Sequence, residues 1–208
     1  MNGRIRSVAI ELSNHAPFTL FGALIGLIII FVLVYGNLLY QISPISENIF
    51  YVLHAIHVFL SALVTTTLYI RYGKRKLWLA VIIGYTGAIG IATISDSIIP
   101  FFGEVLLNLP NAGIHVGFIE EPLLTNIPAI IGIMLGYFKG FTKFPHFGHV
   151  LISTWASLFH VIMAIGIYVN VIQIFFILIF LFLAVWVPCC TSDIVYPLIF
   201  KKKIITKN

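Results

Sequence analysis

Four ionisable side chains lie inside strongly apolar stretches of this sequence: His54, His57, Asp96 and His160. An ionisable group in hydrocarbon costs several kcal/mol unless it has a partner, so such groups often mark ion pathways or catalytic sites. His54 and His57 share one helical face with Ser61, because residues three and four positions apart lie on the same side of a helix. This polar face must point to protein or to water.

Two further stretches carry polar faces of the same kind. Asp96 ends a face of small residues, each four positions apart: Gly84, Ala88 and Ala92. Such a face allows close approach of another helix. His160 follows Ser153 and Ser157 at helical spacing. Because successive spans alternate in direction, we expect His160 and Asp96 to share the outer half of the bundle with the paired histidines.

Neutral imidazoles and a carboxylate are ligands that suit zinc and other first-row divalent ions. Asp96 can serve as a ligand or as the partner that orients a ligating imidazole. In the segment 102–121, which follows the span of Asp96, three further residues can complete the site or collect ions at its mouth: His115, Glu120 and Glu121. The sequence therefore predicts an intramembrane divalent-metal site, with zinc favoured, formed by His54, His57, Asp96, His160, His115 and Glu120.

A second polar feature interrupts the last apolar run, where Pro188 precedes two cysteines, a threonine, a serine and an aspartate. Proline removes a backbone donor and can kink a helix. The sequence predicts an inner site near the cytoplasmic mouth, formed by Cys189, Cys190, Asp193 and His149. The alternative is a simple proline kink with two buried thiols and an aspartate paired with a nearby base. Adjacent cysteines do not indicate a disulfide framework.

The elements that must position these groups are membrane-spanning helices. The chain has 208 residues, of which 60% are hydrophobic and 9% charged, and a mean hydropathy of +1.07. Apolar runs of about 20 residues are long enough to cross a bilayer. We predict an all-α, polytopic bundle in one domain, residues 1–208, with about six transmembrane helices at 17–40, 49–70, 77–101, 122–138, 147–169 and 172–199.

The basic residues give this bundle a direction. With six spans they fall on one face, in four groups: Arg4 and Arg6, Arg71 to Lys76, Lys139 and Lys143, and Lys201 to Lys207. Lys and Arg resist translocation, so this face and both termini are expected in the cytoplasm. The net charge of +5 then reflects orientation and contact with the lipid bilayer, not nucleic-acid binding. Segment 102–121 is expected outside, as a re-entrant or interfacial cap.

The first functional hypothesis is a transporter or permease for a divalent transition metal, in the cell or plasma membrane. A homo-oligomer is compatible with the sequence. The second is a metal-dependent intramembrane hydrolase with a lipid substrate. Its general design resembles that of the alkaline-ceramidase and progestin-receptor class of membrane hydrolases, which also join histidines, an aspartate and a serine on several helices. The His54-x-x-His57 spacing and the six spans depart from that class, so the chain is not assigned to it.

Three other interpretations stay open. A b-type haem held between His54 or His57 and His160 is chemically feasible, but the outer side offers no basic partner for the propionates. The polar groups can also serve only as hydrogen-bonding contacts between helices, or the chain can be a non-catalytic membrane subunit. The sequence has no Gly-rich phosphate loop, Gly-x-Ser-x-Gly elbow or His-Glu-x-x-His helix, which disfavours ATP-driven and serine-hydrolase chemistry.

Overall fold

The computed structural model is all-α in the part of the chain that it describes, residues 3–72, 75–139, 143–166, 168–190 and 196. The elements in chain order are α1 Gly3–Tyr35, α2 Leu39–Tyr72, α3 Leu77–Thr93, the π-helix η1 Ile94–Ile98, α4 Ile99–Leu106, α5 Gly117–Glu120, α6 Pro122–Phe138, α7 Lys143–Ala164 and α8 Val171–Cys190. The continuous helix made of α3, η1 and α4 is treated below as one rod.

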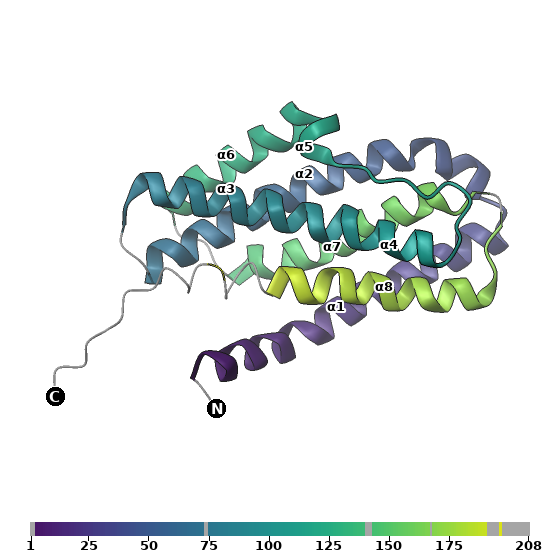
Figure 1. Ribbon diagram of the computed structural model, residues 1–208, viewed down its shortest axis with the longest axis horizontal. Helices are drawn as coiled ribbons and strands as arrows, with labels where there is room; N and C mark the ends of the chain where they lie inside the picture. Colours follow the sequence, from purple (N-terminus) through teal and green to yellow (C-terminus); the bar gives the residue numbers. More distant parts are fainter. Residues whose placement is uncertain (1–2, 73–74, 140–142, 167, 191–195, 197–208) are drawn as a thin grey trace.

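The long helices lie roughly side by side and alternate in direction (Figure 1). Helix α2 is central and packs most extensively against α7 and α6, and then against α3. Helices α1 and α8 pack against each other and against α7. The short α5 precedes α6, which lies along α2.

Among the described residues, four helices are long and apolar enough to cross a membrane: Ala16–Tyr35, Leu39–Arg71, Leu77–Leu106 and Val171–Cys189. Two shorter apolar helices, Pro122–Phe138 and Gly148–Ala164, accompany them. All six lie where the sequence predicts a span. The structure thus confirms an all-α chain with several apolar helices of membrane-spanning character.

The helix ends differ from the predicted spans. Helix α2 begins at Leu39, so the predicted outer loop at 41–48 is helical, and the α3 rod continues to Leu106 instead of ending near 101. Hydropathy locates the apolar part of a helix and misses polar or amphipathic turns that extend it. Helix α7 ends at Ala164, shortly before Gly166, whose positive φ of 64° suits a glycine. The predicted end of the last span, 191–199, lies outside the described residues except for Tyr196.

The surface of the bundle differs from that of a soluble protein. Large apolar side chains on the surface are widely exposed, for example Phe21 at 61% and Phe138 at 70%. The interior contains apolar clusters and also buries histidines, serines, threonines and two carboxylates completely or nearly so. Contiguous exposed apolar surface of this extent is typical of contact with lipid. These observations support a multi-pass integral membrane protein.

Glycines allow the close contact between α2 and α6. A Cβ atom on Gly132 would lie 2.4 Å from the Phe59 carbonyl oxygen, and one on Gly136 would lie 2.6 Å from the Leu63 carbonyl oxygen. The two glycines are four positions apart, and small residues at this spacing let two membrane helices approach closely. This contact holds α6 against the helix that carries His54 and His57.

Candidate functional site

Asp96 lies in the π-helical turn η1, at the point where α3 passes into α4. A π-helical turn inserts an extra residue into the helix, and such turns are frequent at functional sites. The rod continues for ten residues to Leu106, so Asp96 lies about 15 Å from the rod's end at 1.5 Å per residue. The carboxylate is completely buried.

One carboxylate oxygen of Asp96 binds both histidines of α2. The distance from Oδ2 is 2.9 Å to Nδ1 of His54 and 2.7 Å to Nδ1 of His57, and both rings are fully buried. An ionised carboxylate only accepts hydrogen bonds, so both Nδ1 atoms donate to it. This arrangement fixes the tautomer of each ring and leaves each Nε2 facing away from the carboxylate.

The other oxygen of Asp96 is held by two serines. Oδ1 accepts hydrogen bonds from Ser95 and from Ser153 of α7, each at 2.7 Å. The thiol of Cys189 lies 3.7 Å from Oγ of Ser153 and 3.8 Å from Nε2 of His57. Asp96, His57, Cys189 and Ser153 thus form a closed cycle of contacts among four helices, named here the central ring.

Two residues of the predicted inner site, His149 and Cys189, lie beside a residue of the predicted outer site. His149 is buried, and its ring stacks on His57 with a centroid distance of 5.8 Å and an interplanar angle of 13°. Together with Cys189, it therefore lies beside the ring that contacts Asp96. Of the remaining residues predicted for the inner site, Asp193 and the side chain of Cys190 lie outside the described residues.

His160, which was predicted to share a metal site with Asp96, contacts a different carboxylate. Its Nδ1 lies 2.6 Å from Oε1 of Glu104, a carboxylate in the last turn of α4 that is 1% exposed. Oε2 of Glu104 also accepts a hydrogen bond from the Gly113 amide at 3.3 Å. This difference from the prediction has a simple cause. The rod is longer than predicted, so it places a second acidic residue, Glu104, near its outer end and within contact of His160.

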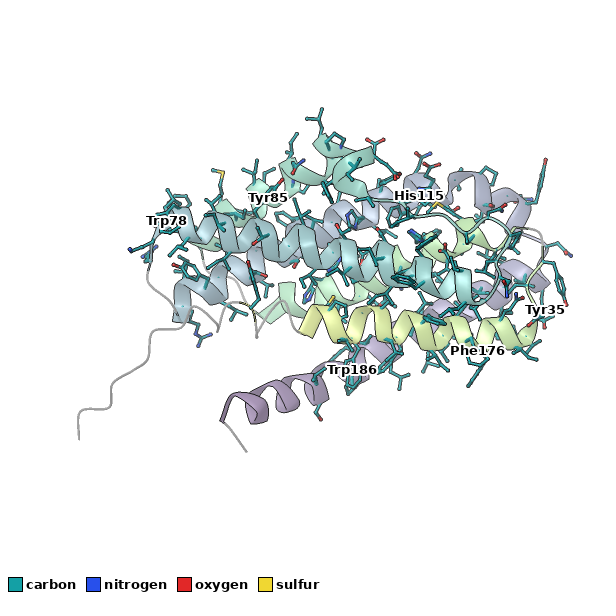
Figure 2. The ribbon with its side chains drawn as sticks, in the orientation of Figure 1. Tyr35, Trp78, Tyr85, His115, Phe176 and Trp186 are labelled. Carbon is teal, nitrogen blue, oxygen red and sulfur yellow. The ribbon has the colours of Figure 1, made fainter. Side chains whose placement is uncertain are left out.

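A second polar group therefore lies closer to the rod's end than the central ring. The ring of His115 contacts His160 with centroids 5.4 Å apart, and its Nδ1 lies 3.3 Å from Oε2 of Glu120. Glu120 also accepts hydrogen bonds from the Tyr51 hydroxyl and from a backbone amide. Glu104, His160, His115, Glu120 and Tyr51 are named here the outer group. Figure 2 shows His115 in the half of the molecule that also contains Tyr35 and Phe176.

Phe50 joins the two groups. Its ring stacks on His54 at 5.6 Å between centroids and contacts the edge of His160 at 5.2 Å. Nε2 of His54 and Nε2 of His160 are both buried and have no hydrogen-bond partner among the described residues. His54 also lies against Gly117, where a Cβ atom would come within 2.8 Å of Nε2. The first residue of α5 therefore packs directly against this imidazole.

The surroundings of Glu120, which lies outside the spanning helices, favour the charged form of its carboxyl group. Partial burial alone raises the pKa of this carboxyl, but hydrogen bonds from Tyr51, from the Val116 amide and from His115 outweigh that effect, and the pKa is lowered below its ordinary value. The outer group therefore carries a stable negative charge at its exposed rim.

Of the six residues predicted to bind metal, His57 and Asp96 belong to the central ring, and His54 binds Asp96 from beside that ring. The other three, His160, His115 and Glu120, belong to the outer group. Among the described residues, no group of three or more His, Cys, Asp or Glu side chains is arranged to hold a metal ion. Four residues that contribute to these contacts were not among the predicted site residues: Glu104, Tyr51, Ser95 and Ser153. Glu104 lies eight positions after Asp96 and could have been found by extending the helical face by two turns.

Comparison of this chain with models of known protein families, with curated proteins and with solved structures gives no significant match.

Proposed function

We propose that this protein is a membrane transporter for a divalent transition-metal cation, with zinc as the favoured cargo and the central ring as its binding station. In this proposal the six apolar helices all cross the bilayer and both termini lie in the cytoplasm. The proposed cargo and the transport role both depend on a polar pathway through the bundle, whereas the orientation depends on the basic residues.

The distribution of charge supports this orientation. Four described basic residues lie at the end of α2, the start of α3 and the end of α6: Arg71, Arg75, Lys76 and Lys139. Figure 2 shows Trp78, just after this basic segment, at one end of the molecule and Tyr35 at the other. The acidic outer group, which includes His115, lies in the half of the molecule that contains Tyr35. Positive charge on one face of a membrane protein indicates the cytoplasmic side.

The observation that carries the proposal is the contact between His57 and Cys189. Their Nε2 and Sγ atoms are 3.8 Å apart. Two such ligands of one tetrahedral zinc ion lie about 3.5 Å apart, from bond lengths of about 2.0 Å to nitrogen and 2.3 Å to sulfur. Asp96 holds the opposite nitrogen of His57, which is the carboxylate-histidine arrangement that orients metal-binding imidazoles.

The charges of the ring also suit a divalent ion. Asp96 and a Cys189 thiolate together contribute two negative charges, which balance one divalent cation in a buried site. Binding therefore displaces the thiol proton, as well as any proton that makes one imidazole cationic. Two protein ligands hold an ion less firmly than three or four. A site that must release its cargo benefits from such moderate binding.

A polar stripe on α2 continues beyond the ring toward the basic end. Its members are 0–1% exposed, and their hydroxyl groups have no hydrogen-bond partner among the described residues: Ser61, Thr65 and Thr66. Buried hydroxyls normally bond to protein or to ordered water. With the outer group on the other side of the ring, this stripe gives a cation polar contacts along much of the bundle, which favours transport over catalysis at a single site.

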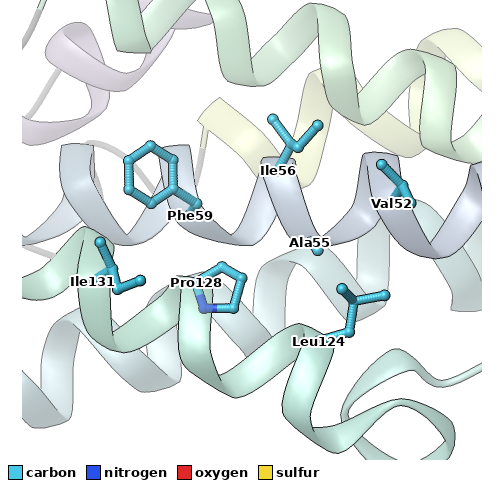
Figure 3. Close-up of a pocket in the computed structure, with 7 residues that line it drawn as sticks. All are labelled: Val52, Ala55, Ile56, Phe59, Leu124, Pro128 and Ile131. Carbon is cyan, nitrogen blue, oxygen red and sulfur yellow. The ribbon is translucent and has the colours of Figure 1, made fainter.

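The hydrolase alternative has less support. A catalytic zinc normally has three protein ligands and an open position, whereas the described residues offer no such set of three. A groove of about 360 Å³ between α2 and α6 opens where lipid is expected, but all of its lining residues are apolar (Figure 3). The haem alternative is weakened by Phe50, which packs against both His54 and His160.

Zinc flux into proteoliposomes tests the proposal. The purified full-length chain, reconstituted in sealed vesicles containing a fluorescent zinc indicator, should admit externally added zinc faster than protein-free vesicles. Magnesium, which prefers oxygen ligands, should enter no faster than in the protein-free control. Zinc entry equal to that of empty vesicles, from protein shown to be folded, would remove the transport claim and favour a non-catalytic subunit.

A further inference from the structure

A pocket lined by cationic side chains lies at the basic end of the bundle. It has a volume of about 340 Å³ and lies between the ends of α2 and α6. Arg71, Arg75 and Lys139 line it together with Thr67 and the aromatic rings of two neighbouring residues, Tyr137 and Phe138. Among these lining residues, all in the described part of the chain, none is acidic. Its volume is in the range of small-ligand sites.

One of these cations is held in a defined orientation. The guanidinium carbon of Arg75 lies 5.5 Å from the centroid of the Tyr137 ring. Stacking on an aromatic ring uses the face of the guanidinium and leaves its N–H edge available. That edge has the planar, forked geometry that binds phosphate oxygens in pairs, and Lys139 adds a second positive charge to the same pocket.

The surroundings of the pocket are those of a membrane boundary. Thr67 and Ile70 belong to the last turns of the apolar span Leu39–Arg71, and Phe138, which is 70% exposed, ends α6. The cationic side chains suit the charged headgroup of a phospholipid, and the neighbouring apolar side chains suit its acyl chains. Basic pockets between membrane helices on the cytoplasmic side are suited to anionic headgroups.

We propose that this pocket binds the phosphate of an anionic phospholipid headgroup, with Arg75 and Lys139 as its principal ligands. The shared chemistry is a phosphate group, so free phosphate is the second source to be tested. The inference is independent of the proposed transport: it needs only the pocket, its charges and its place at the end of two apolar helices. Binding here would fix the ends of α2 and α6 relative to the membrane surface beside them.

Native mass spectrometry of the full-length chain with added phosphatidylglycerol or phosphatidylcholine tests this proposal. The double variant Arg75→Gln/Lys139→Gln removes two positive charges from the pocket. The control Lys76→Gln removes one from an exposed neighbour that does not line it. Wild type and Lys76→Gln should retain phosphatidylglycerol preferentially. The double variant should bind it about 30-fold more weakly, from roughly a fivefold contribution per basic residue near the membrane surface.

A second arm adds inorganic phosphate at millimolar concentration. If inorganic phosphate binds the wild type but not the double variant, and displaces the lipid, the ligand of the pocket is free phosphate. If inorganic phosphate leaves the lipid bound, the ligand of the pocket is the lipid headgroup. Equal retention of phosphatidylglycerol by the double variant and the wild type, or equal retention of phosphatidylcholine and phosphatidylglycerol by the wild type, would overturn the proposal. Thermal unfolding of each variant in detergent checks that the substitutions leave the fold intact.

Discussion

Replacing Asp96 by alanine should lower the free energy of unfolding by about 3–5 kcal/mol, the cost of removing one partner from a buried charged group. The carboxylate is completely buried and holds two imidazoles and two serine hydroxyls. The substitution leaves the Nδ1 donors of His54 and His57 without an acceptor. Equilibrium unfolding of the purified protein in mixed detergent and SDS micelles measures the change.

Glu121→Ala is the matched control, because Glu121 is an exposed carboxylate in the loop before α6. Exposed substitutions usually change stability by no more than about 0.5 kcal/mol. Asp96→Asn retains the size of the side chain and one acceptor oxygen, so it should fall between the alanine variant and the wild type. An Asp96→Ala protein as stable as Glu121→Ala would show that the central ring does not hold the helices together.

Replacing Cys189 by serine should weaken zinc binding strongly while the fold is retained. Serine preserves the size of the side chain but removes the soft thiolate that, in the proposal, binds the metal directly. Loss of even an indirect partner of a metal site costs about 10- to 100-fold in affinity, so loss of a direct ligand should cost at least that much. Isothermal titration calorimetry of wild type and variant in detergent gives the comparison.

Ser153→Ala provides the contrast for this variant. It also breaks the central ring, at the neighbouring contact to Asp96, but it removes no proposed metal ligand. We expect Ser153→Ala to lower stability while retaining most of the zinc affinity. If both variants bind zinc as the wild type does, Cys189 is not a ligand. If both lose it equally, integrity of the ring, and not the thiol, governs binding.

Much of the fold could be predicted because a bilayer imposes one rule on every helix. A run of about 20 apolar residues indicates a span whatever its neighbours are. Helix α6 begins and ends where the sequence places it, at 122–138. The same rule misses the polar ends of helices. Residues 41–48 and the turns leading to Leu106 are helical, but hydropathy alone does not distinguish a polar helical turn from a loop.

The faces of the helices were also predictable from spacing. His54 and His57 share a buried face of α2, and the small residues Ala88 and Ala92 are buried against α2 and α6 as their spacing indicated. Helical periodicity specifies which residues point the same way, since each residue rotates by a fixed angle along the helix. The spacing thus predicts that the two histidines point the same way, and in the structure both contact Asp96.

The relative height of the helices could not be predicted. Cys189 was expected near the cytoplasmic mouth, but it contacts His57, and His160 was expected beside Asp96, but it contacts Glu104. The level at which two spans meet depends on their lengths, tilts and terminal turns, which packing against neighbours determines. The π-helical turn at Asp96 adds a further change of register that no residue pattern in the sequence indicates.

X-ray absorption at the zinc edge, on purified protein loaded with one equivalent of zinc, tests the metal site in the central ring most directly. The proposal predicts a sulfur scatterer at about 2.3 Å together with imidazole nitrogen at about 2.0 Å. The sulfur contribution should disappear in Cys189→Ser and persist in Ser153→Ala. A wild-type spectrum with only nitrogen and oxygen around zinc, or protein that retains no zinc, would contradict the assignment of the ring as a metal station.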